Sequence, residues 1–197
     1  MESTTALFTP IVFAGPSGVG KGTLIGLLLQ EYPDKVVHCI SHTTKQPRST
    51  EQDGKDYHFV TKEVFEQLAH SGFFVETAQV HGNWYGTSFD AINAVKSSCK
   101  LCLLDLNIEG CSSLRAADIS AYLLFIAPPS IEVLESRLRG RKTEDEATIQ
   151  IRLETAAREL TFVDNSMWDE VIVNDDIDSC YDQVKAFINK RNAAFDN

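Results

Sequence analysis

The chain has 197 residues and carries 18 Lys and Arg against 28 Asp and Glu, so its formal charge is −10. This length suits one domain with a complete hydrophobic core. The composition, with 43% hydrophobic and 23% charged residues, argues against a disordered or collagen-like chain. Proteins that bind nucleic acids are usually basic, so the acidic balance argues against that class as well.

Signals for a membrane span or for secretion do not stand out in the sequence. A bilayer span needs roughly 20 apolar residues in a row, and the polar start Met1–Ala6 is unlike the basic and apolar regions of a signal peptide. The cysteines are odd in number, which does not favour a disulfide framework. We therefore expect reduced thiols and a cytoplasmic protein. The cysteines are Cys39, Cys99, Cys102, Cys111 and Cys180.

Apolar runs alternate with helical patterns along the chain. Strands are expected at 11–14, 36–41 and 57–61, helices at 24–32 and 62–70, and a hairpin of 73–80 and 84–88 around Gly82-Asn83. Farther along, strands are expected at 100–106, 122–127 and 170–174, and helices at 90–97, 131–139, 144–160 and 177–191. Strands that alternate with helices indicate βαβ units and a mostly parallel sheet. Residues 41–88 break this alternation, which predicts an inserted subdomain.

A glycine-rich segment follows the first expected strand and opens the first expected helix. The stretch Gly15-Pro-Ser-Gly-Val-Gly-Lys-Gly-Thr23 has the G-x4-G-K spacing of a Walker A motif. Its glycines let the backbone curl so that consecutive N–H groups point at phosphate oxygens, and the helix N-terminus adds partial positive charge. Lys21 would reach the β- and γ-phosphates of ATP. The ATP-binding residues expected here are Gly15, Ser17, Gly18, Val19, Gly20, Lys21, Gly22 and Thr23.

Two residues bear on a metal ion. Gly22 stands where the motif expects a Ser or Thr hydroxyl on Mg²⁺, and G-K-G-T is also the form that adenylate kinases use. Asp105 ends an apolar run and is the natural Walker B carboxylate, although an Asp at a strand end also suits a turn or cap. We predict that Asp105 holds Mg²⁺ through water.

Several other motifs occur along the chain: Ser41-His-Thr-Thr-Lys-Gln-Pro-Arg48, Asp53-Gly-Lys-Asp-Tyr-His-Phe59, Val75-Glu-Thr-Ala-Gln79, Gly82-Asn-Trp-Tyr-Gly-Thr87, Phe125-Ile-Ala-Pro-Pro-Ser130, Leu138-Arg-Gly-Arg-Lys-Thr-Glu144 and Val171-Ile-Val-Asn-Asp175. In this order and spacing they closely resemble the guanylate kinase family of nucleoside monophosphate kinases, from about Pro10 to Lys190. The resemblance implies an α/β fold, a P-loop NTPase three-layer core with a parallel sheet, plus an inserted GMP-binding subdomain and a lid. It also implies Mg²⁺-dependent transfer of the ATP γ-phosphoryl group to GMP.

The resemblance divides the chain into parts. Residues 1–197 would form one domain, with a core of 1–40, 89–135 and 153–197 that carries the P-loop at 15–23. Residues 41–88 would form the GMP-binding subdomain, and 136–152 the lid. The expected partners are ATP and GMP, with dGMP as an alternative acceptor, and neither a nucleic acid nor a membrane. The protein would be a monomer or a homodimer.

The resemblance also implies a GMP site. Ser41 and Thr87 would offer hydroxyls to guanine O6, and Glu76 would accept from guanine N1–H and the 2-amino group. Adenine would leave these groups mispaired, which can discriminate by 10⁴-fold or more in a well-built polar site. Lys45, Arg48, Tyr57 and Tyr85 would meet the GMP phosphate. The complete GMP-binding set is Ser41, Lys45, Arg48, Tyr57, Glu76, Tyr85, Thr87, Asp105 and Asn107.

Two residues of this set depart from the family's pattern. Lys45 stands where the family usually has Arg, so the charge is kept but the bidentate fork is lost. Asn107 stands where a second carboxylate usually follows Asp105, so one acceptor is kept and donors are added. Turnover and GMP affinity are the properties that these two changes would affect.

Basic residues concentrate in the expected lid, although a charged connector between helices is commonly a solvated face. The resemblance assigns Arg141 and Arg152 to the transferring phosphoryl group, which makes the catalytic set Lys21, Arg48, Arg141 and Arg152. It also assigns Arg137, Asn174 and Asp175 to ATP. A closing lid that delivers arginines would position and neutralise the phosphates and exclude water.

Other functions stay open on the sequence alone. A kinase for another nucleoside monophosphate is suggested by Gly22, but it would need a different pocket in place of Ser41, Glu76 and Thr87. A guanylate-kinase-like interaction module without catalysis would usually lack an intact P-loop. A nucleic-acid-binding ATPase is disfavoured by the charge of −10.

Overall fold

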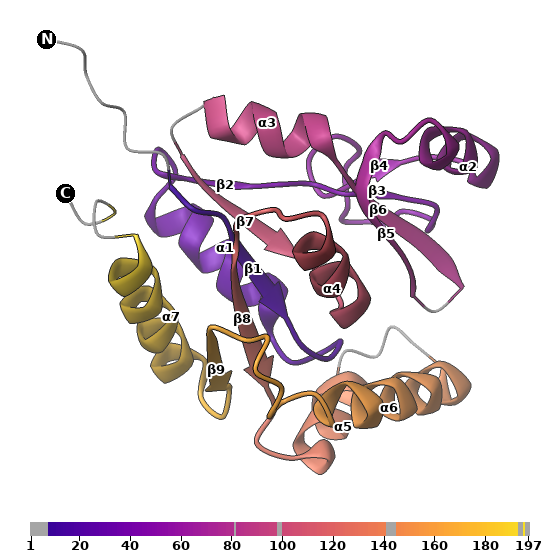
Figure 1. Cartoon of the computed structure of the whole chain (residues 1–197). Helices are drawn as coiled ribbons and strands as arrows, with labels where there is room; N and C mark the ends of the chain where they lie inside the picture. Colours follow the sequence, from indigo (N-terminus) through magenta and orange to yellow (C-terminus); the bar gives the residue numbers. More distant parts are fainter. Residues whose placement is uncertain (1–7, 81, 98–99, 141–144, 193–194, 196–197) are drawn as a thin grey trace, which may run out of the picture.

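The computed structural model describes residues 8–80, 82–97, 100–140, 145–192 and 195. A five-stranded sheet forms the middle of the molecule, and a smaller four-stranded sheet lies at one end. In Figure 1 the smaller sheet and its helix lie to the right, while helices α5 (Ile131–Gly140) and α6 (Glu146–Leu160) lie below the central sheet. The arrangement confirms the predicted α/β class.

The central sheet is wholly parallel, in the order β2-β7-β1-β8-β9. Parallel strands covered on both faces consist of short apolar runs, as the three central strands do. The connection that follows β1 runs to β2 on one side, whereas the connection that follows its neighbour β7 runs to β8 on the other side. Open parallel sheets bind ligands at the carboxyl ends of two strands whose connections diverge in this way. The strands are β1 (Ile11–Ala14), β2 (Val36–His38), β7 (Leu101–Asp105), β8 (Tyr122–Ala127) and β9 (Glu170–Val173).

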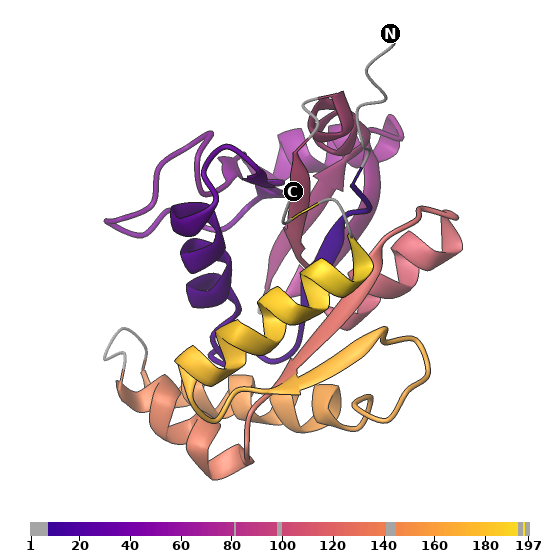
Figure 2. The same cartoon turned by 90° about the vertical axis from the view of Figure 1, so that its left-hand side faces the viewer.

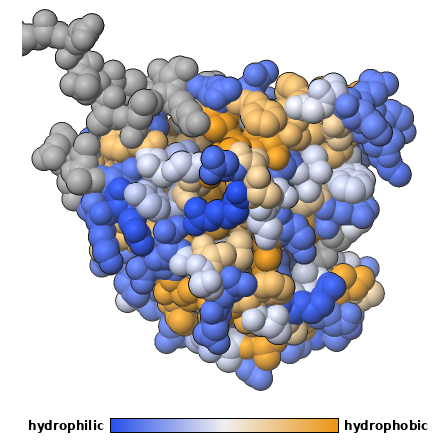
Figure 3. Space-filling model, in the orientation of Figure 1, coloured by the Kyte–Doolittle hydropathy of each residue, from blue (hydrophilic) through white to orange (hydrophobic). Residues whose placement is uncertain are grey.

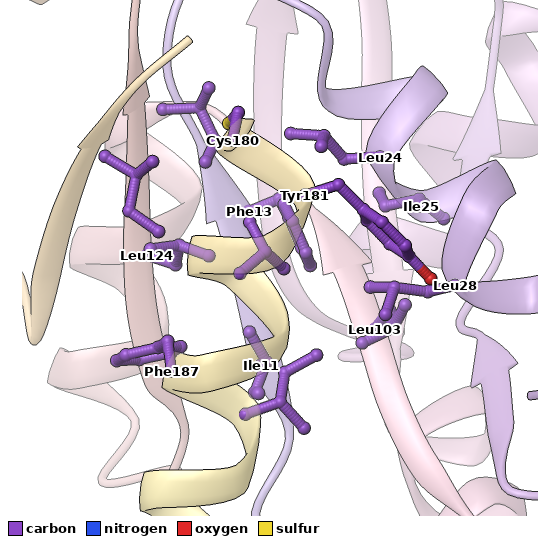
Figure 4. Close-up of a cluster of buried hydrophobic side chains, with 14 of the residues drawn as sticks. Ile11, Phe13, Leu24, Ile25, Leu28, Leu103, Leu124, Cys180, Tyr181 and Phe187 are labelled. Carbon is purple, nitrogen blue, oxygen red and sulfur yellow. The ribbon is translucent and has the colours of Figure 1, made fainter. Parts of the chain in front are cut away.

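Helices cover both faces of this sheet. Helices α1 (Lys21–Glu31) and α7 (Ile177–Arg191) pack on one face, and Figure 4 shows Leu28 and Phe187 in one buried cluster with the strand residues Ile11 and Leu103. Figure 2 shows α7 in front of the sheet. Helices α3 (Phe89–Ser97) and α4 (Ile108–Ala116) add to the second cluster, on the other face. Burying one Leu or Phe side chain contributes about 1.5–3 kcal/mol, so the two clusters hold the three layers together.

The second sheet is built entirely from the expected insertion, in the order β4-β3-β6-β5. Its apolar face packs against α2 (Lys62–His70), where the Phe65 ring stacks on Phe74 at 4.7 Å and on Trp84 at 6.0 Å. Strands β5 and β6 form the expected hairpin. The strands are β3 (His42–Thr43), β4 (His58–Phe59), β5 (Phe74–Val80) and β6 (Asn83–Ser88).

Two elements were not predicted from the sequence. Strand β3 has two residues, which is too short to show alternation. Helix α4 carries a weak apolar pattern, and its start was interpreted as part of a ligand motif. The Asn107 side chain in fact caps α4, accepting a hydrogen bond from Gly110 N at 2.9 Å. Asn is among the preferred N-cap residues, so this position held the signal that could have revealed the helix.

Several predicted boundaries were wrong by a few residues. Helix α1 begins at Lys21 rather than 24, because the phosphate loop ends at Gly20 and the chain turns helical at once. Strand β2 ends at His38 rather than 41, although the Cys39 amide still donates to Leu103 O at 2.8 Å. Such ends depend on hydrogen-bond partners elsewhere in the sequence.

The outer surface is mixed in polarity. Figure 3 shows hydrophilic residues over much of one face, with hydrophobic residues interspersed among them. Within the described ranges, no helix is both long enough and apolar enough to cross a bilayer.

Candidate functional site

A cleft of about 690 Å³ opens at the carboxyl ends of β1 and β7. The phosphate loop forms its floor, the second sheet one wall, and α6 the other. Most of the site residues predicted from the sequence therefore come together in one place, although they span more than 130 positions along the chain. The predicted residues that line it are Gly15, Ser17, Gly18, Gly20, Lys21, Gly22, Thr23, Ser41, Lys45, Arg48, Tyr57, Glu76, Tyr85, Asp105, Asn107 and Arg152.

The other predicted residues lie elsewhere. Val19 and Thr87 are fully buried behind the lining. Arg137, Asn174 and Asp175 lie outside the lining. Arg141 falls outside the described residues, so its predicted role stays a prediction.

The phosphate loop depends on glycine at its first position. Gly15 has a φ of 124°, and a Cβ there would lie 2.1 Å from the backbone oxygen of Ile126. Only glycine adopts this conformation without strain and leaves that space empty. The loop therefore packs directly on the end of β8.

Lys21 reaches back over the loop. Its ammonium donates to Gly15 O at 2.6 Å and to Pro16 O at 3.3 Å, and lies 3.6 Å from Asp105 Oδ1. Asp105 is near because β1 and β7 are neighbours with Phe13 opposite Asp105. The lysine and the carboxylate predicted for the Walker A and Walker B positions thus meet at the floor of the cleft.

The donor set beside the loop fits a cation held largely by water and nucleotide oxygens. Asp105 supplies a hard carboxylate oxygen of the kind that Mg²⁺ prefers. A Cβ built on Gly22 meets no atom within 4 Å, so the space that a motif hydroxyl would occupy is open. Across the described ranges, no group of three or more His, Cys, Asp or Glu side chains could hold a metal ion.

A buried polar pocket lies at the second-sheet wall. Glu76 is 4% exposed, and its Oε1 accepts from Thr87 N at 2.9 Å. These two residues are cross-strand partners in the β5–β6 hairpin. The Ser41 and Thr87 hydroxyl oxygens lie 3.2 Å apart. Burial raises the pKa of Glu76, while its hydrogen bonds from Thr87 act in the opposite direction. The pocket therefore combines one carboxylate acceptor with two hydroxyls.

A basic and aromatic cluster lines the cleft next to this pocket. The Lys45 ammonium lies 4.9 Å from the centre of the Tyr57 ring, an arrangement that favours a cation. Burial raises the pKa of both Tyr57 and Tyr85. Both hydroxyls therefore stay protonated near neutral pH and can donate to an anion.

Sequence reasoning missed Glu51, which pairs with this cluster. Lys45 Nζ lies 2.5 Å from each Glu51 carboxylate oxygen, and Arg48 N donates to Glu51 Oε2 at 2.8 Å. The side chains of Lys45 and Glu51 are only 13% and 12% exposed. A carboxylate three residues after Arg48 and six after Lys45 was the available signal. Glu51 holds both cations at the cleft wall.

Replacing Glu51 by Gln is expected to destabilise the fold by about 1–2 kcal/mol, between the values for exposed and buried ion pairs. Burial tends to raise the pKa of Glu51, but the Arg48 N–H and Lys45 bring it below 4.5. The stabilisation is thus present above pH 4.5 and is lost as the pH falls through the lower folded-state pKa.

Urea unfolding at pH 7 and at pH 3 would measure this effect. The matched control is Glu66→Gln, which breaks the exposed Lys62–Glu66 pair at 3.7 Å and should change stability little. Equal effects of the two substitutions at pH 7 would contradict the role of Glu51.

The predicted catalytic residue Arg152 and the residues predicted on the ATP side contact the phosphate loop and its surroundings. Arg152 on α6 donates to the hydroxyl of Ser17 in the loop. Asn174 is buried and donates to Val19 O at 2.7 Å. Arg137 donates to the backbone oxygen of Asn174 at 2.8 Å and to that of Asp175 at 3.0 Å. Asn174 and Arg137 thus brace the loop, and their contacts with ATP stay predictions.

Sequence reasoning also missed Glu159, a second carboxylate on α6 that lines the cleft. Burial raises its pKa, while the Lys21 charge acts in the opposite direction. The helix periodicity of α6 places Glu159 seven residues after Arg152, on the same face. This spacing was the signal that could have identified it.

The Guanylate kinase family model matches residues 8–191. Guanylate kinase 1 of Oryza sativa subsp. japonica is 47% identical over 180 residues, which are 91% of this chain and 47% of that protein. The guanylate kinase of Schizosaccharomyces pombe is 47% identical over 183 residues, 92% of this chain and 91% of that protein. The human guanylate kinase is 41% identical over 177 residues, 89% and 90% of the two chains. The chain thus spans about half the length of the rice relative and nine-tenths of the other two.

Solved structures with a similar fold include another guanylate kinase. The guanylate kinase from Anaplasma phagocytophilum has a TM-score of 0.75 and 28% identity, covering 95% of this chain and 87% of that one. The SH3-kinase fragment of tight junction protein 3 shares the fold at a TM-score of 0.53 and 14% identity, over 93% and 57% of the two chains. Since the family model and relatives above 40% identity cover nearly the whole sequence, the chain belongs to the guanylate kinase family.

Proposed function

We propose that this chain is an ATP:GMP phosphotransferase, which transfers the γ-phosphoryl group of ATP to GMP and yields ADP and GDP. One observation carries the proposal: the buried Glu76 carboxylate and the Ser41 hydroxyl, which Thr87 contacts from behind, line the same cleft as the phosphate loop and Lys21. No predicted contact involves the ribose 2′ position, so dGMP is an alternative acceptor.

The polar pocket would select guanine. Glu76 would accept from guanine N1–H and the 2-amino group, while Ser41 and Thr87 offer hydroxyls to O6. Adenine has no N1–H and carries an amino group in place of O6, so it would leave all three side chains mispaired. Unpaired buried polar groups make such sites strongly discriminating.

The basic and aromatic cluster would hold the phosphate of GMP. Lys45 and Arg48 supply positive charge, and the Tyr57 and Tyr85 hydroxyls donate hydrogen bonds. The phosphate would then lie between the guanine pocket and the phosphate loop, with one oxygen toward the γ-phosphate of ATP. Holding the two reactants in line supplies much of the rate of a phosphoryl transfer.

Lys21 and Arg152 would neutralise the phosphoryl group as it moves. Lys21 donates to the loop carbonyls of Gly15 and Pro16, and on nucleotide binding these hydrogen bonds would be replaced by bonds to phosphate oxygens. Arg152 already contacts Ser17 in the loop, so its guanidinium lies beside the predicted γ-phosphate position. Charge placed in advance where charge develops lowers the barrier.

Mg²⁺ fits the open space beside Asp105 and Gly22, where it would supply charge neutralisation between the β- and γ-phosphates. Asp105 would hold it through water. Gly22 contributes no ligand. The affinity of the protein for Mg²⁺ would therefore be lower than in a loop with a hydroxyl at this position.

Replacing Gly22 by Ser is therefore expected to tighten Mg²⁺ binding to the ATP-loaded protein about three- to tenfold, because one hydroxyl ligand is added. Gly22→Ala is the matched control: Cβ has open space in both variants, and both should gain about 0.5–1 kcal/mol in helix stability. Magnesium titration of ATP binding and thermal unfolding separate the two effects. Equal Mg²⁺ affinity in the two variants would contradict the prediction.

A coupled assay of ADP release tests the proposed function. ATP and Mg²⁺ are supplied with GMP, AMP, UMP, CMP or dTMP in separate reactions. Rapid turnover with GMP alone is the expected result. Turnover with AMP would overturn the guanine pocket, and GMP binding without turnover would point to a non-catalytic interaction module.

We also infer that the chain works in the cytoplasm. The four cysteines in the described part of the chain, Cys39, Cys102, Cys111 and Cys180, are free and buried. Free buried thiols suit a reducing compartment.

A further inference from the structure

Helix α4 begins directly against the guanine pocket. Gly110 lies in its first turn, and a Cβ built there would lie 3.0 Å from Glu76 Oε2. It would also lie 3.2 Å from Asn107 Oδ1 and 3.3 Å from Leu106 Cβ. Carbon atoms rarely approach so closely, so any side chain at this position would displace a neighbour by a few tenths of an ångström.

We propose that Gly110 determines the preference for guanine, because the hydrogen in place of its side chain leaves room for Glu76 Oε2 to serve the 2-amino group. This inference rests on the proposed function and adds a positioning residue to it. Gly110 itself touches no part of GMP in this account and acts only through Glu76.

The two carboxylate oxygens of Glu76 have different surroundings. Oε1 accepts from Thr87 N at 2.9 Å, and the Thr87 hydroxyl is the group proposed for guanine O6. The edge of guanine runs from O6 through N1 to the 2-amino group. The oxygen farther from Thr87 is therefore the one that faces the 2-amino group, and that oxygen is Oε2, beside Gly110.

Glu76 is the neighbour most able to move. The first turn of α4 is held by the hydrogen bond from Gly110 N to Asn107 Oδ1 at 2.9 Å, and Leu106 is buried. The carboxylate is instead the end of a side chain with three rotatable bonds. The positive end of α4 also favours a carboxylate close to it. A methyl group at position 110 would push Oε2 away from both the helix end and guanine.

A side chain at position 110 should affect purine bases differently, according to whether they carry a 2-amino group. Inosine monophosphate has guanine's O6 and N1–H but lacks the 2-amino group, so it never uses the contact that Gly110 protects. Gly110→Ala should therefore weaken GMP binding about tenfold, the size expected when one hydrogen bond to a charged group is impaired. Binding of inosine monophosphate should change about threefold at most.

Calorimetric titration of the full chain with GMP and with inosine monophosphate tests this proposal. The matched control is Gly26→Ala, at a glycine of α1 where an added Cβ meets nothing within 4 Å. The control should keep both affinities within about twofold, while Gly110→Ala lowers the preference for GMP over inosine monophosphate. An unchanged preference, or an equal loss for both ligands, would overturn the proposal.

Two features keep the test decisive. Alanine is a better helix former than glycine, and the ratio of two affinities measured on one sample does not depend on the folded fraction.

The titration also needs no turnover. A wild-type protein that prefers GMP but releases no ADP would overturn the proposed activity alone, whereas a wild-type protein without that preference would overturn the role of Gly110.

Discussion

Replacing Lys21 by Ala is expected to lower kcat with ATP and GMP by about 10³-fold, as the loss of a charge that stabilises a transferring phosphoryl group does. The ammonium is held above the phosphate loop by Gly15 O at 2.6 Å and lies 3.6 Å from Asp105. No other Lys lines the floor of the cleft in the described ranges, so no side chain of the same length can replace it.

Steady-state kinetics with the coupled ADP assay measure this loss. Lys62→Ala is the matched control, because Lys62 is 66% exposed on α2, away from the cleft, and should retain full activity. Thermal unfolding of both variants separates catalysis from folding. Normal turnover by the Lys21 variant would remove the phosphate loop from the mechanism.

Replacing Glu76 by Gln is expected to lower kcat/KM for GMP by about 10³-fold, within the range for sites that read polar groups. The Gln carbonyl can keep the bond from Thr87 N, so the fold is retained. The amide NH₂ would then face guanine N1–H and the 2-amino group, and donors would meet donors. Discrimination against AMP should shrink accordingly, because AMP loses no contact.

The ratio of kcat/KM for GMP to that for AMP measures the preference directly. Glu66→Gln makes the same chemical change at a residue that is 52% exposed on α2, and it should leave the ratio as it is. An unaltered ratio in the Glu76 variant would show that another group reads the base.

Elements of the central sheet were predicted closely because they depend on local composition. The strands at 11–14 and 122–127 were predicted at their observed bounds, since each is a short apolar run that helices must cover. The phosphate loop was predicted equally well, because glycines at this fixed spacing between a strand and a helix are typical of a phosphate-binding loop. Helix α4 was missed because its start was interpreted as part of a ligand motif, whereas Asn107 caps the helix.

The candidate site was predicted in part. Lys21 was named from the phosphate-loop motif, and Glu76 and Arg152 from the resemblance to the family. The structure places all three in one cleft. Glu51 and Gly110 were not predicted, because the spacing of Glu51 after Lys45 and Arg48 was not used and no pattern near Gly110 points to Glu76. Glu51 matters through its contacts with Lys45 and Arg48, and Gly110 through the space it leaves for Glu76.

By itself, the sequence determined the α/β class, the phosphate loop and the resemblance to guanylate kinases, because these reside in the order and spacing of residues near one another. Only the tertiary structure decided which groups meet: it brought Asp105 to Lys21 through neighbouring strands and set α4 against Glu76. Contacts between distant segments follow from how layers pack, and packing to a few tenths of an ångström is decided by the whole fold at once.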